Sequence, residues 1–184
     1  MCWGTNSQGQ LGDNTTTDRP APTAMVAAGP WSKVSASTDF GLHTCAIHSN
    51  GSLWCWGWDI EGALGTAATT GFEPVPALVS SASWTDVDTA NRASCAVRAD
   101  GTLWCWGSNL AGSRDGTYGI DGSDGPALDL PAQVGTDTDW SNVALAIDHG
   151  CARKTNGDVW CWGTNGSGQL GSPSWAPAFR PVVR

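Results

Sequence analysis

The chain has 184 residues and a mass of 19.1 kDa, which is the length of one domain or of part of a larger one. It carries 9 Lys and Arg against 17 Asp and Glu, and its formal net charge is −8. These numbers exclude a basic nucleic-acid binder, and no apolar run approaches the roughly 20 residues of a membrane span. The first six residues have neither a basic region nor an apolar core, so we expect no signal peptide in this chain.

A repeat of about fifty residues organises the chain. The motif Trp-Cys-Trp-Gly occurs at residues 54–57, 104–107 and 160–163, and residues 1–4 are a fourth copy with Met in place of the first Trp. Each full copy is preceded by a Cys-Ala pair and, further upstream, by a Trp-x-x-Val motif. We therefore divide the chain into one half repeat and three full repeats, with boundaries at 1–30, 31–83, 84–139 and 140–184.

Each full repeat predicts four short strands and no helix. In the first full repeat we expect strands over residues 31–37, 43–48, 52–56 and 75–79, and the prolines of the last one restrict it to a sheet edge. No segment shows sustained helical periodicity. The fold class is therefore all-β, a β-propeller of four-stranded blades, with fourteen strands in total. The half repeat supplies only the third and fourth strands of its blade, so an isolated chain would leave strand edges uncovered.

The spacing of six cysteines predicts three cross-strand disulfides. The triplets 49–51, 99–101 and 155–157 each end in Gly, as three-residue hairpin loops do. Centring each hairpin on its triplet places two cysteines opposite one another at a non-hydrogen-bonded position, where side chains approach most closely. Reduced buried cysteines and, with less support from the spacing, zinc ligands remain the alternatives. The predicted pairs are Cys45 with Cys55, Cys95 with Cys105, and Cys151 with Cys161.

Disulfides indicate an oxidising compartment, so the cysteine pairs predict an extracellular or cell-surface protein. Cys2 is the seventh cysteine and has no predicted partner in the chain. We expect its thiol to be free or bonded to another molecule.

The run Trp-Cys-Trp-Gly-Thr-Asn-x-x-Gly-Gln-Leu-Gly, preceded by His43-Thr44-Cys45-Ala46-Ile47 and by Asn50-Gly51, resembles the regulator of chromosome condensation repeat. The resemblance covers nearly the whole chain and implies about half of a seven-bladed propeller. It implies no single function, because that family includes a guanine-nucleotide exchange factor, a plant UV-B photoreceptor and a secreted β-lactamase inhibitor. The doubled cysteines resemble the versions of the repeat found in secreted bacterial proteins. The sequence departs from the pattern at Gly112-Ser113-Arg114-Asp115, where Gly-Gln-Leu-Gly is expected.

The sequence offers few candidates for chemistry. The repeated Trp residues are typical of packing between blades, and we expect His43 and His149 to form hydrogen bonds within the blades. No Ser-His-Asp set or carboxylate pair stands out, so we expect no catalytic residues and no cofactor. One Gly-rich acidic loop is a candidate calcium site, with a solvated surface loop as the alternative. Its possible ligands are Asp115, Asp121 and Asp124.

The variable loops at 13–19, 61–72, 108–125 and 172–179 are the predicted binding surface. Their non-repeated aromatic residues are candidates for partner binding, although each is equally compatible with packing inside its loop. We expect a non-enzymatic protein-interaction scaffold that assembles with copies of itself into an oligomer or filament. The alternative is a fragment of a larger propeller that acts as a regulator, exchange-factor-like or partner-inhibiting. The candidate aromatic residues are Trp58, Phe72, Tyr118 and Trp175.

Overall fold

The computed structural model describes residues 1–27, 29–37, 42–67, 71–108, 126–171 and 180–181. Within these ranges the chain forms fourteen strands, as predicted, and one short 3-10 turn, Ile60–Gly62. The strands are β1 (Cys2–Gly4), β2 (Arg19–Thr23), β3 (Trp31–Ala36), β4 (His43–His48), β5 (Leu53–Trp58), β6 (Phe72–Ser80), β7 (Trp84–Ala90), β8 (Ala93–Arg98), β9 (Leu103–Gly107), β10 (Leu128–Gln133), β11 (Trp140–Leu145), β12 (His149–Lys154), β13 (Val159–Gly163) and β14 (Arg180–Pro181).

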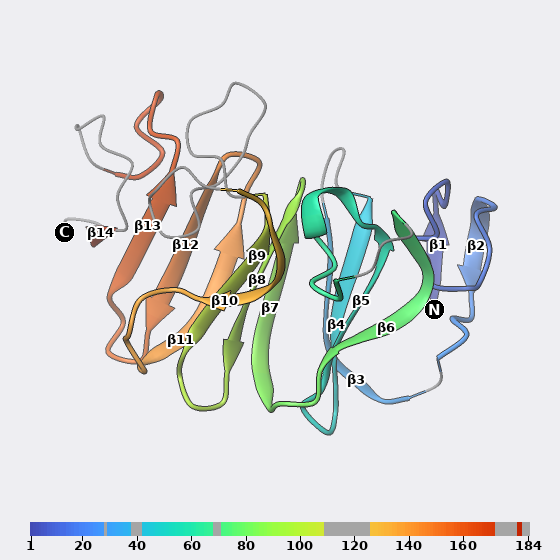
Figure 1. Ribbon diagram of the computed structural model, residues 1–184, viewed down its shortest axis with the longest axis horizontal. Coiled ribbons are helices and arrows are strands. Elements are labelled where there is room, and N and C mark those ends of the chain that lie inside the picture. Colours follow the sequence, from blue (N-terminus) through green and yellow to red (C-terminus); the bar gives the residue numbers. More distant parts are fainter. Residues whose placement is uncertain (28, 38–41, 68–70, 109–125, 172–179, 182–184) are drawn as a thin grey trace.

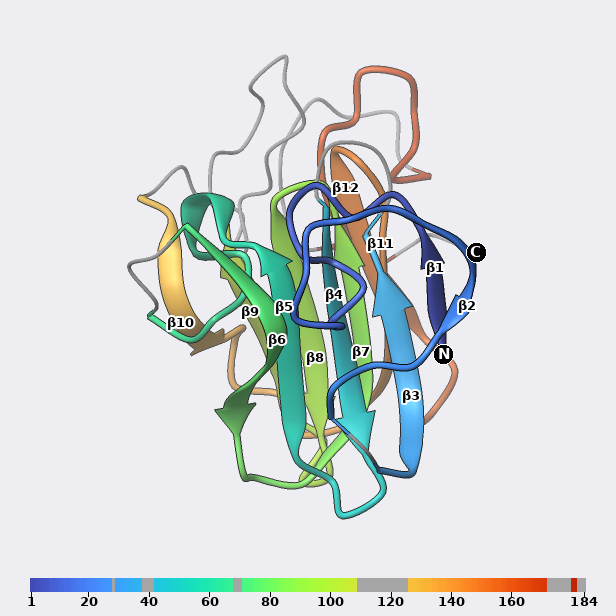
Figure 2. The ribbon, with the colours of Figure 1, turned by 90° about the vertical axis from the view of Figure 1, so that its right-hand side faces the viewer.

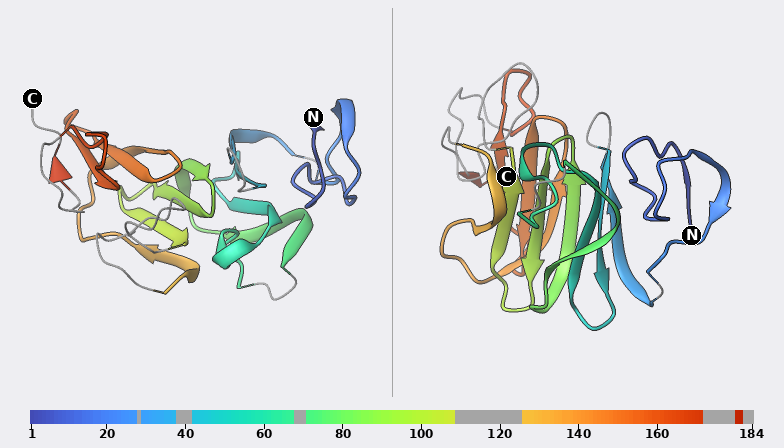
Figure 3. Two further views of the ribbon diagram at one scale, coloured as in Figure 1. Left: turned by 90° about the horizontal axis from the view of Figure 1, so that it is seen from above. Right: turned by 45° about the vertical axis from the view of Figure 1, so that its right-hand side comes forward.

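Three antiparallel four-stranded sheets follow one another along the chain, and each keeps its strands in sequence order. We call them blade 1 (β3 to β6), blade 2 (β7 to β10) and blade 3 (β11 to β14). The pair β1 and β2 forms a separate two-stranded sheet, the half-blade. The blades stand side by side in an arc, with the half-blade beyond blade 1 at one end and blade 3 at the other (Figures 1 and 3). The first strands of successive blades are neighbours in space, β3 with β7 and β7 with β11.

Hairpin turns fix the register within each blade. In blade 1 the Gly51 N–H donates to the His48 carbonyl at 2.8 Å, with Gly51 at a φ of 88° that favours glycine. This turn places Cys45 opposite Cys55, and their Cα atoms are 4.1 Å apart, as in a non-hydrogen-bonded pair. All three predicted disulfides are present in the structure: Cys45–Cys55, Cys95–Cys105 and Cys151–Cys161.

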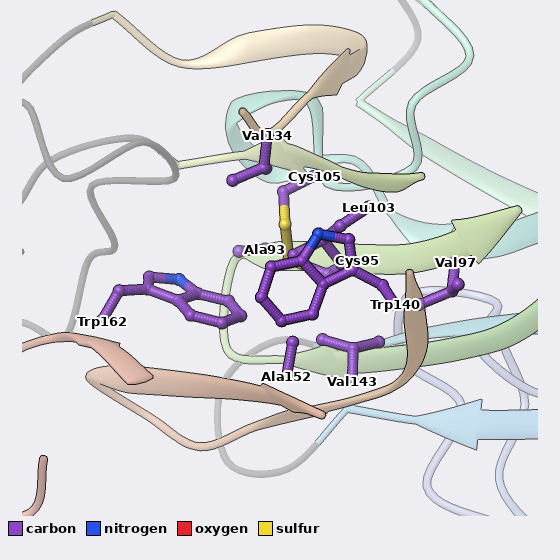
Figure 4. Packing of buried hydrophobic residues seen from close by; sticks show 10 residues of the cluster. All are labelled: Ala93, Cys95, Val97, Leu103, Cys105, Val134, Trp140, Val143, Ala152 and Trp162. Carbon is purple, nitrogen blue, oxygen red and sulfur yellow. A yellow bond between two sulfur atoms is a disulfide. The ribbon is translucent and has the colours of Figure 1, made fainter. Parts of the chain in front are cut away.

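The core lies between neighbouring blades rather than within one. Each disulfide of blades 1 and 2 faces the next blade, whose second motif Trp points back toward it. Figure 4 shows this arrangement between blades 2 and 3, where Trp140 and Trp162 lie beside the Cys95–Cys105 disulfide. Because a tryptophan side chain buries roughly 150–250 Å², these residues provide much of the apolar contact between blades. The corresponding residues Trp56, Trp106 and Trp162 are fully buried.

The Gly-Gln-Leu-Gly motif connects one blade to the next. The Trp56 indole N–H donates to the Gln10 carbonyl at 2.9 Å, and Trp106 makes the equivalent bond to the Ala63 carbonyl at 2.9 Å. A Cβ atom on Gly12 would lie 2.9 Å from the Trp56 indole nitrogen, and Gly12 has a φ of 70°. The motif therefore needs glycine at this point, because the turn lies directly against the indole.

Candidate interaction surface at the half-blade

The half-blade contains only the outer two strands of a blade. In blades 1 and 2 the third strand is hydrogen-bonded to the second strand on one side and to the fourth strand on the other. In the half-blade, β1 corresponds to the third strand and is paired with β2 alone. Among the described residues, no strand covers its other edge. Figure 2 shows β1 standing apart from β3 and β4 of blade 1.

The side chains around this edge are exposed, although the same repeat positions are buried elsewhere in the chain. Val34 on β3 is 60% exposed, whereas its equivalents Val87 and Val143 are 0% and 2% exposed. Trp3 on β1 is 61% exposed, whereas its equivalent Trp56 is 0% exposed. The side chains that form the contact between blades elsewhere in the chain are therefore present here, but no described strands cover them.

A pocket of about 460 Å³ lies between β1 and blade 1. Cys2 lies on its wall and has no disulfide partner in the chain, as predicted. Partial burial raises the pKa of the Cys2 thiol. We call this pocket the half-blade groove, and its lining includes Cys2, Trp3, Leu11, Val34, Ala36 and His43.

Carboxylates on the first strand of blade 2 hold the neighbouring blades in register. Asp86 accepts hydrogen bonds from the Val143 N–H at 2.8 Å and from the ammonium group of Lys33. Asp88 accepts from the Leu145 N–H at 2.7 Å. These bonds connect β7 to β11 and β3 on either side. Val34 and Ala36 are the equivalents of Val143 and Leu145 and lie on the wall of the half-blade groove.

The half-blade is held together by a buried polar centre. Asn6 is 0% exposed, and its side chain accepts from the Leu11 N–H at 2.9 Å and donates to the Asp13 carboxylate at 3.1 Å. The Arg19 guanidinium lies 2.6 Å from the same carboxylate. Burial raises the pKa of Asp13, but hydrogen bonds from Thr15, Arg19 and Asn6 outweigh it and lower the pKa to about 2. The half-blade is thus built as an ordered element.

The opposite end of the arc presents a different face. The side of blade 3 that points away from blade 2 carries Arg153 and Val159, at the positions of Ile47 and Leu53 in blade 1. Ile47 and Leu53 are 1% and 0% exposed, whereas Val159 is 36% exposed and Arg153 is exposed. The two ends of the chain therefore expose the two sides of one kind of interface.

Two predicted binding residues lie on strands and not in a loop. Trp58 ends β5, Phe72 begins β6, and the two residues are opposite one another in the ladder. The prediction that Trp58 and Phe72 belong to loops is therefore wrong, because the pairing of β5 with β6 resumes at Gly57 after a bulge and continues to Trp58. Phe72 is 38% exposed and Trp58 is half-buried, so both remain near the surface.

Other predicted residues lie outside the described ranges. Tyr118 and Trp175 do so, as do the candidate calcium ligands Asp115, Asp121 and Asp124. Across the described part of the chain, no group of three or more His, Cys, Asp or Glu side chains is placed to hold a metal ion. No helix in that part is long and apolar enough to span a membrane.

Of the two histidines, His149 makes the predicted contact within its blade, whereas the prediction for His43 is wrong because its ring contacts the neighbouring blade. His43 is 1% exposed, and its Nε2 lies 2.9 Å from the Ser94 hydroxyl of the next blade. His149 Nδ1 lies 2.9 Å from the Asp148 carboxylate. The half-blade groove itself was not predicted. Its sequence signal was the unmatched third and fourth strands before Trp31, together with the odd cysteine.

Comparison with known proteins identifies the class to which this repeat belongs. Residues 32–62, 85–113 and 143–169 match the family model described as Regulator of chromosome condensation (RCC1) repeat. The chain therefore contains three RCC1 repeats, and they are folded as blades of a β-propeller.

Solved structures show the same fold at low sequence identity. Prp20p from Saccharomyces cerevisiae, described with its binding properties to Gsp1p and histones, is 22% identical with a TM-score of 0.79. That match covers 98% of this chain and 46% of Prp20p. Yeast RCC1 (Prp20) bound to Kap60 is 21% identical with a TM-score of 0.76, and the match covers 98% of this chain and 45% of Prp20. Human WBSCR16 is 20% identical with a TM-score of 0.74, and the match covers 96% of this chain and 44% of WBSCR16. The chain therefore spans less than half the length of these propellers.

Proposed function

We propose that the chain is a non-enzymatic protein-interaction scaffold whose docking site is the half-blade groove. The occupant is the first and second strands of another repeat of this family, with a cysteine on the second strand. The single observation that carries the proposal is the exposure of Val34, 60% against 0% for Val87, because blades 2 and 3 show what covers this position. The chain's three first-and-second strand pairs are all used within its own blades, so the occupant lies outside these 184 residues.

Three features of the groove fit such an occupant. The uncovered edge of β1 offers backbone groups for an added antiparallel strand. A cysteine on that strand, at the position of Cys95, would lie opposite Cys2, as Cys95 lies opposite Cys105. Carboxylates at the positions of Asp86 and Asp88 would meet the backbone of Val34 and Ala36. The groove thus supplies apolar, hydrogen-bonding and covalent complementarity to one kind of strand pair.

The cysteine chemistry supports an extracellular or cell-surface location. Three disulfides in the described residues need an oxidising environment to form and persist. The same environment would allow Cys2 to form a disulfide with its occupant. Location in this setting is therefore part of the proposal.

Binding of a peptide made from the chain's own repeat tests this function. The probe is a fluorescent peptide of residues 82–99 with Cys95→Ser, so that only non-covalent binding is measured. We expect it to bind at least about tenfold more tightly than a scrambled peptide, and Val34→Asp to remove that difference. The matched control is Val159→Asp, an equally simple change at the opposite end of the arc. Equal binding of both peptides, or unchanged binding to Val34→Asp, would overturn the proposal.

Self-assembly is a second candidate function, and the exposure of Trp3 favours it. Trp3 at one end and Val159 at the other are the two halves of a blade contact that blades 1 and 2 already make. Copies joined head to tail through these faces would extend the arc into an oligomer or filament. Sedimentation velocity of the wild type should show species above 19.1 kDa, and Trp3→Glu should show the monomer alone. A wild type that remains monomeric at high concentration would reject self-assembly and leave the groove proposal standing.

A regulatory role as part of a larger propeller is compatible with the same groove. In that case the occupant strands belong to the remainder of the propeller, and the blade loops contact the regulated protein. Prp20p is described with its binding to Gsp1p and histones, so propellers of this class do bind proteins. The acidic net charge of −8 weighs against a nucleic-acid partner.

A further inference from the structure

A second, smaller pocket of about 140 Å³ opens on blade 1, away from the half-blade groove. The indole rings of Trp31 and Trp54 stand nearly perpendicular on its wall, with centroids 6.5 Å apart and an interplanar angle of 86°. We call this pocket the blade 1 notch. Its lining residues are Ala27, Trp31, His48, Asn50, Ser52 and Trp54.

Blades 2 and 3 have the same pair of tryptophans, and in both a cationic side chain lies against the rings. In blade 2 the Arg98 guanidinium carbon is 3.8 Å from the Trp104 ring centroid and 4.8 Å from that of Trp84. In blade 3 the Lys154 ammonium nitrogen is 4.9 Å from Trp140 and 5.5 Å from Trp160. All four distances lie within the range of cation–π attraction. The repeat thus uses this place to hold a positive charge.

Blade 1 has His48 at the position of Arg98 and Lys154. The register is the same in all three blades, because the first Trp of each lies opposite this residue in the ladder. The His48 imidazole is shorter than an arginine or lysine side chain and contacts Trp31 edge-on, with centroids 5.4 Å apart. Its Nδ1 accepts from the Asn50 N–H at 3.3 Å, which orients it toward its own turn. The ring faces that hold a cation in the other blades are therefore left beside a pocket.

We propose that the blade 1 notch binds an organic cation of the size of a guanidinium or methylated ammonium group. The cation would lie between Trp31 and Trp54, as Arg98 lies between Trp84 and Trp104. This site is independent of the half-blade groove and of the function proposed for it.

The polar groups of the notch favour a weakly hydrated cation. Lys154 in blade 3 has two carboxylates beside it, Asp137 at 2.7 Å and Asp139 at 3.0 Å. Among the described residues that line the blade 1 notch there is no carboxylate, and the polar side chains are Asn50, Ser52 and His48. Attraction must therefore come from the indole faces, which suits a cation that loses little hydration energy on binding. A methylated ammonium should bind more tightly than a primary ammonium of the same charge.

Titration with tetramethylammonium chloride, followed by NMR of the tryptophan indole N–H groups, tests the site. The Trp54 N–H donates to the Ser52 hydroxyl at 2.9 Å and reports directly on the notch. The neutral control of similar size is tert-butanol, and sodium chloride controls for ionic strength. We expect saturable shifts confined to the blade 1 indoles with tetramethylammonium alone. Equal shifts with tert-butanol, or shifts spread over all three blades, would overturn the proposal.

Two reciprocal variants make the test specific. His48→Arg places in blade 1 the side chain that fills blade 2, so it should retain the fold and weaken tetramethylammonium binding at least about tenfold. Arg98→His should open a second notch at Trp84 and Trp104 and add a second set of shifting indole signals. If His48→Arg binds as the wild type does, the cation does not lie in the notch and the proposal fails. The result with His48→Arg decides the question whether or not Arg98→His folds.

Discussion

The carboxylate of Asp86 accepts a hydrogen bond of 2.8 Å from the Val143 backbone N–H, across the boundary between blades 2 and 3. The same carboxylate accepts from Asn142 and from Lys33, so one buried side chain connects three successive blades. The arc is therefore held together by its innermost strands as well as by the tryptophans between the sheets. The same relationship indicates that a strand pair added at the half-blade should bring a carboxylate to the backbone of Val34.

Replacing Asp86 should destabilise the whole arc. Asp86→Asn keeps the shape of the side chain but replaces one acceptor oxygen with a donor that faces existing donors. We expect a loss of about 2–4 kcal/mol in the free energy of unfolding, measured by urea denaturation. Asp129→Asn, at an exposed position on β10, is the control and should cost no more than about 0.5 kcal/mol. Equal effects of the two changes would show that the inter-blade bonds contribute little.

The same substitution at two repeat positions should have different costs. Val87→Ala removes methyl groups from a fully buried site and should cost about 1–3 kcal/mol. Val34→Ala should cost less than about 0.5 kcal/mol in the isolated chain, because Val34 is 60% exposed. Urea denaturation of both variants measures the difference. Comparable losses would mean that Val34 is covered in solution.

Removal of one disulfide should weaken the fold without affecting Cys2. The double variant Cys95→Ser with Cys105→Ser opens a bridge that spans 10 positions in sequence. We expect it to unfold about 2–3 kcal/mol more easily, chiefly because the unfolded chain gains freedom. Cys2→Ser is the matched control and should leave stability unchanged. A similar loss in Cys2→Ser would contradict the assignment of Cys2 as unpaired.

The half-blade should make the protein sensitive to acid. The pKa of Asp13 is lowered to about 2 in the folded state from an ordinary value of 3.8, so its charged form stabilises the fold. This contribution is fully present above about pH 4 and is lost as the pH falls through about 2. Asp13→Asn should therefore be less stable at neutral pH, and its deficit should shrink between pH 4 and pH 2. Urea denaturation across this range measures the deficit, and a deficit that is independent of pH would contradict this role.

Much of the fold could be predicted because the same motifs occur in three full repeats. The Trp-Cys-Trp-Gly motif and the Gly-terminated hairpins determine strand order, register and the three disulfides, each supported by a separate copy. Trp58 and Phe72 were misplaced because the length of the β5–β6 ladder depends on pairing after Gly57, which has no local sequence signal. The exposure of Val34 could not be predicted from the sequence around it, because Val34 and Val87 both end a Trp-x-x-Val motif. It depends on which strands are present beside β1.

The blade 1 notch has a sequence signal that only the structure makes readable. His48, Arg98 and Lys154 occupy equivalent positions, but nothing in the sequence alone shows that Arg98 and Lys154 lie against tryptophan rings. Once that packing is known, the shorter side chain of His48 indicates a pocket beside the rings of Trp31 and Trp54.

Covalent capture at Cys2 tests the half-blade groove most directly. The peptide of residues 82–99 is prepared with Cys95 activated as a mixed disulfide with 5-thio-2-nitrobenzoate, so that attack by the Cys2 thiolate forms the new disulfide and releases thionitrobenzoate. The measurement is the rate of thionitrobenzoate release, with the product identified by mass spectrometry and peptide mapping. If β1 accepts a second strand, Cys2 should react through Cys95 at least about tenfold faster than with a scrambled peptide, because binding places the two sulfur atoms opposite one another. Equal rates with both peptides, or a reaction in Val34→Asp at least as fast as in the wild type, would contradict the account.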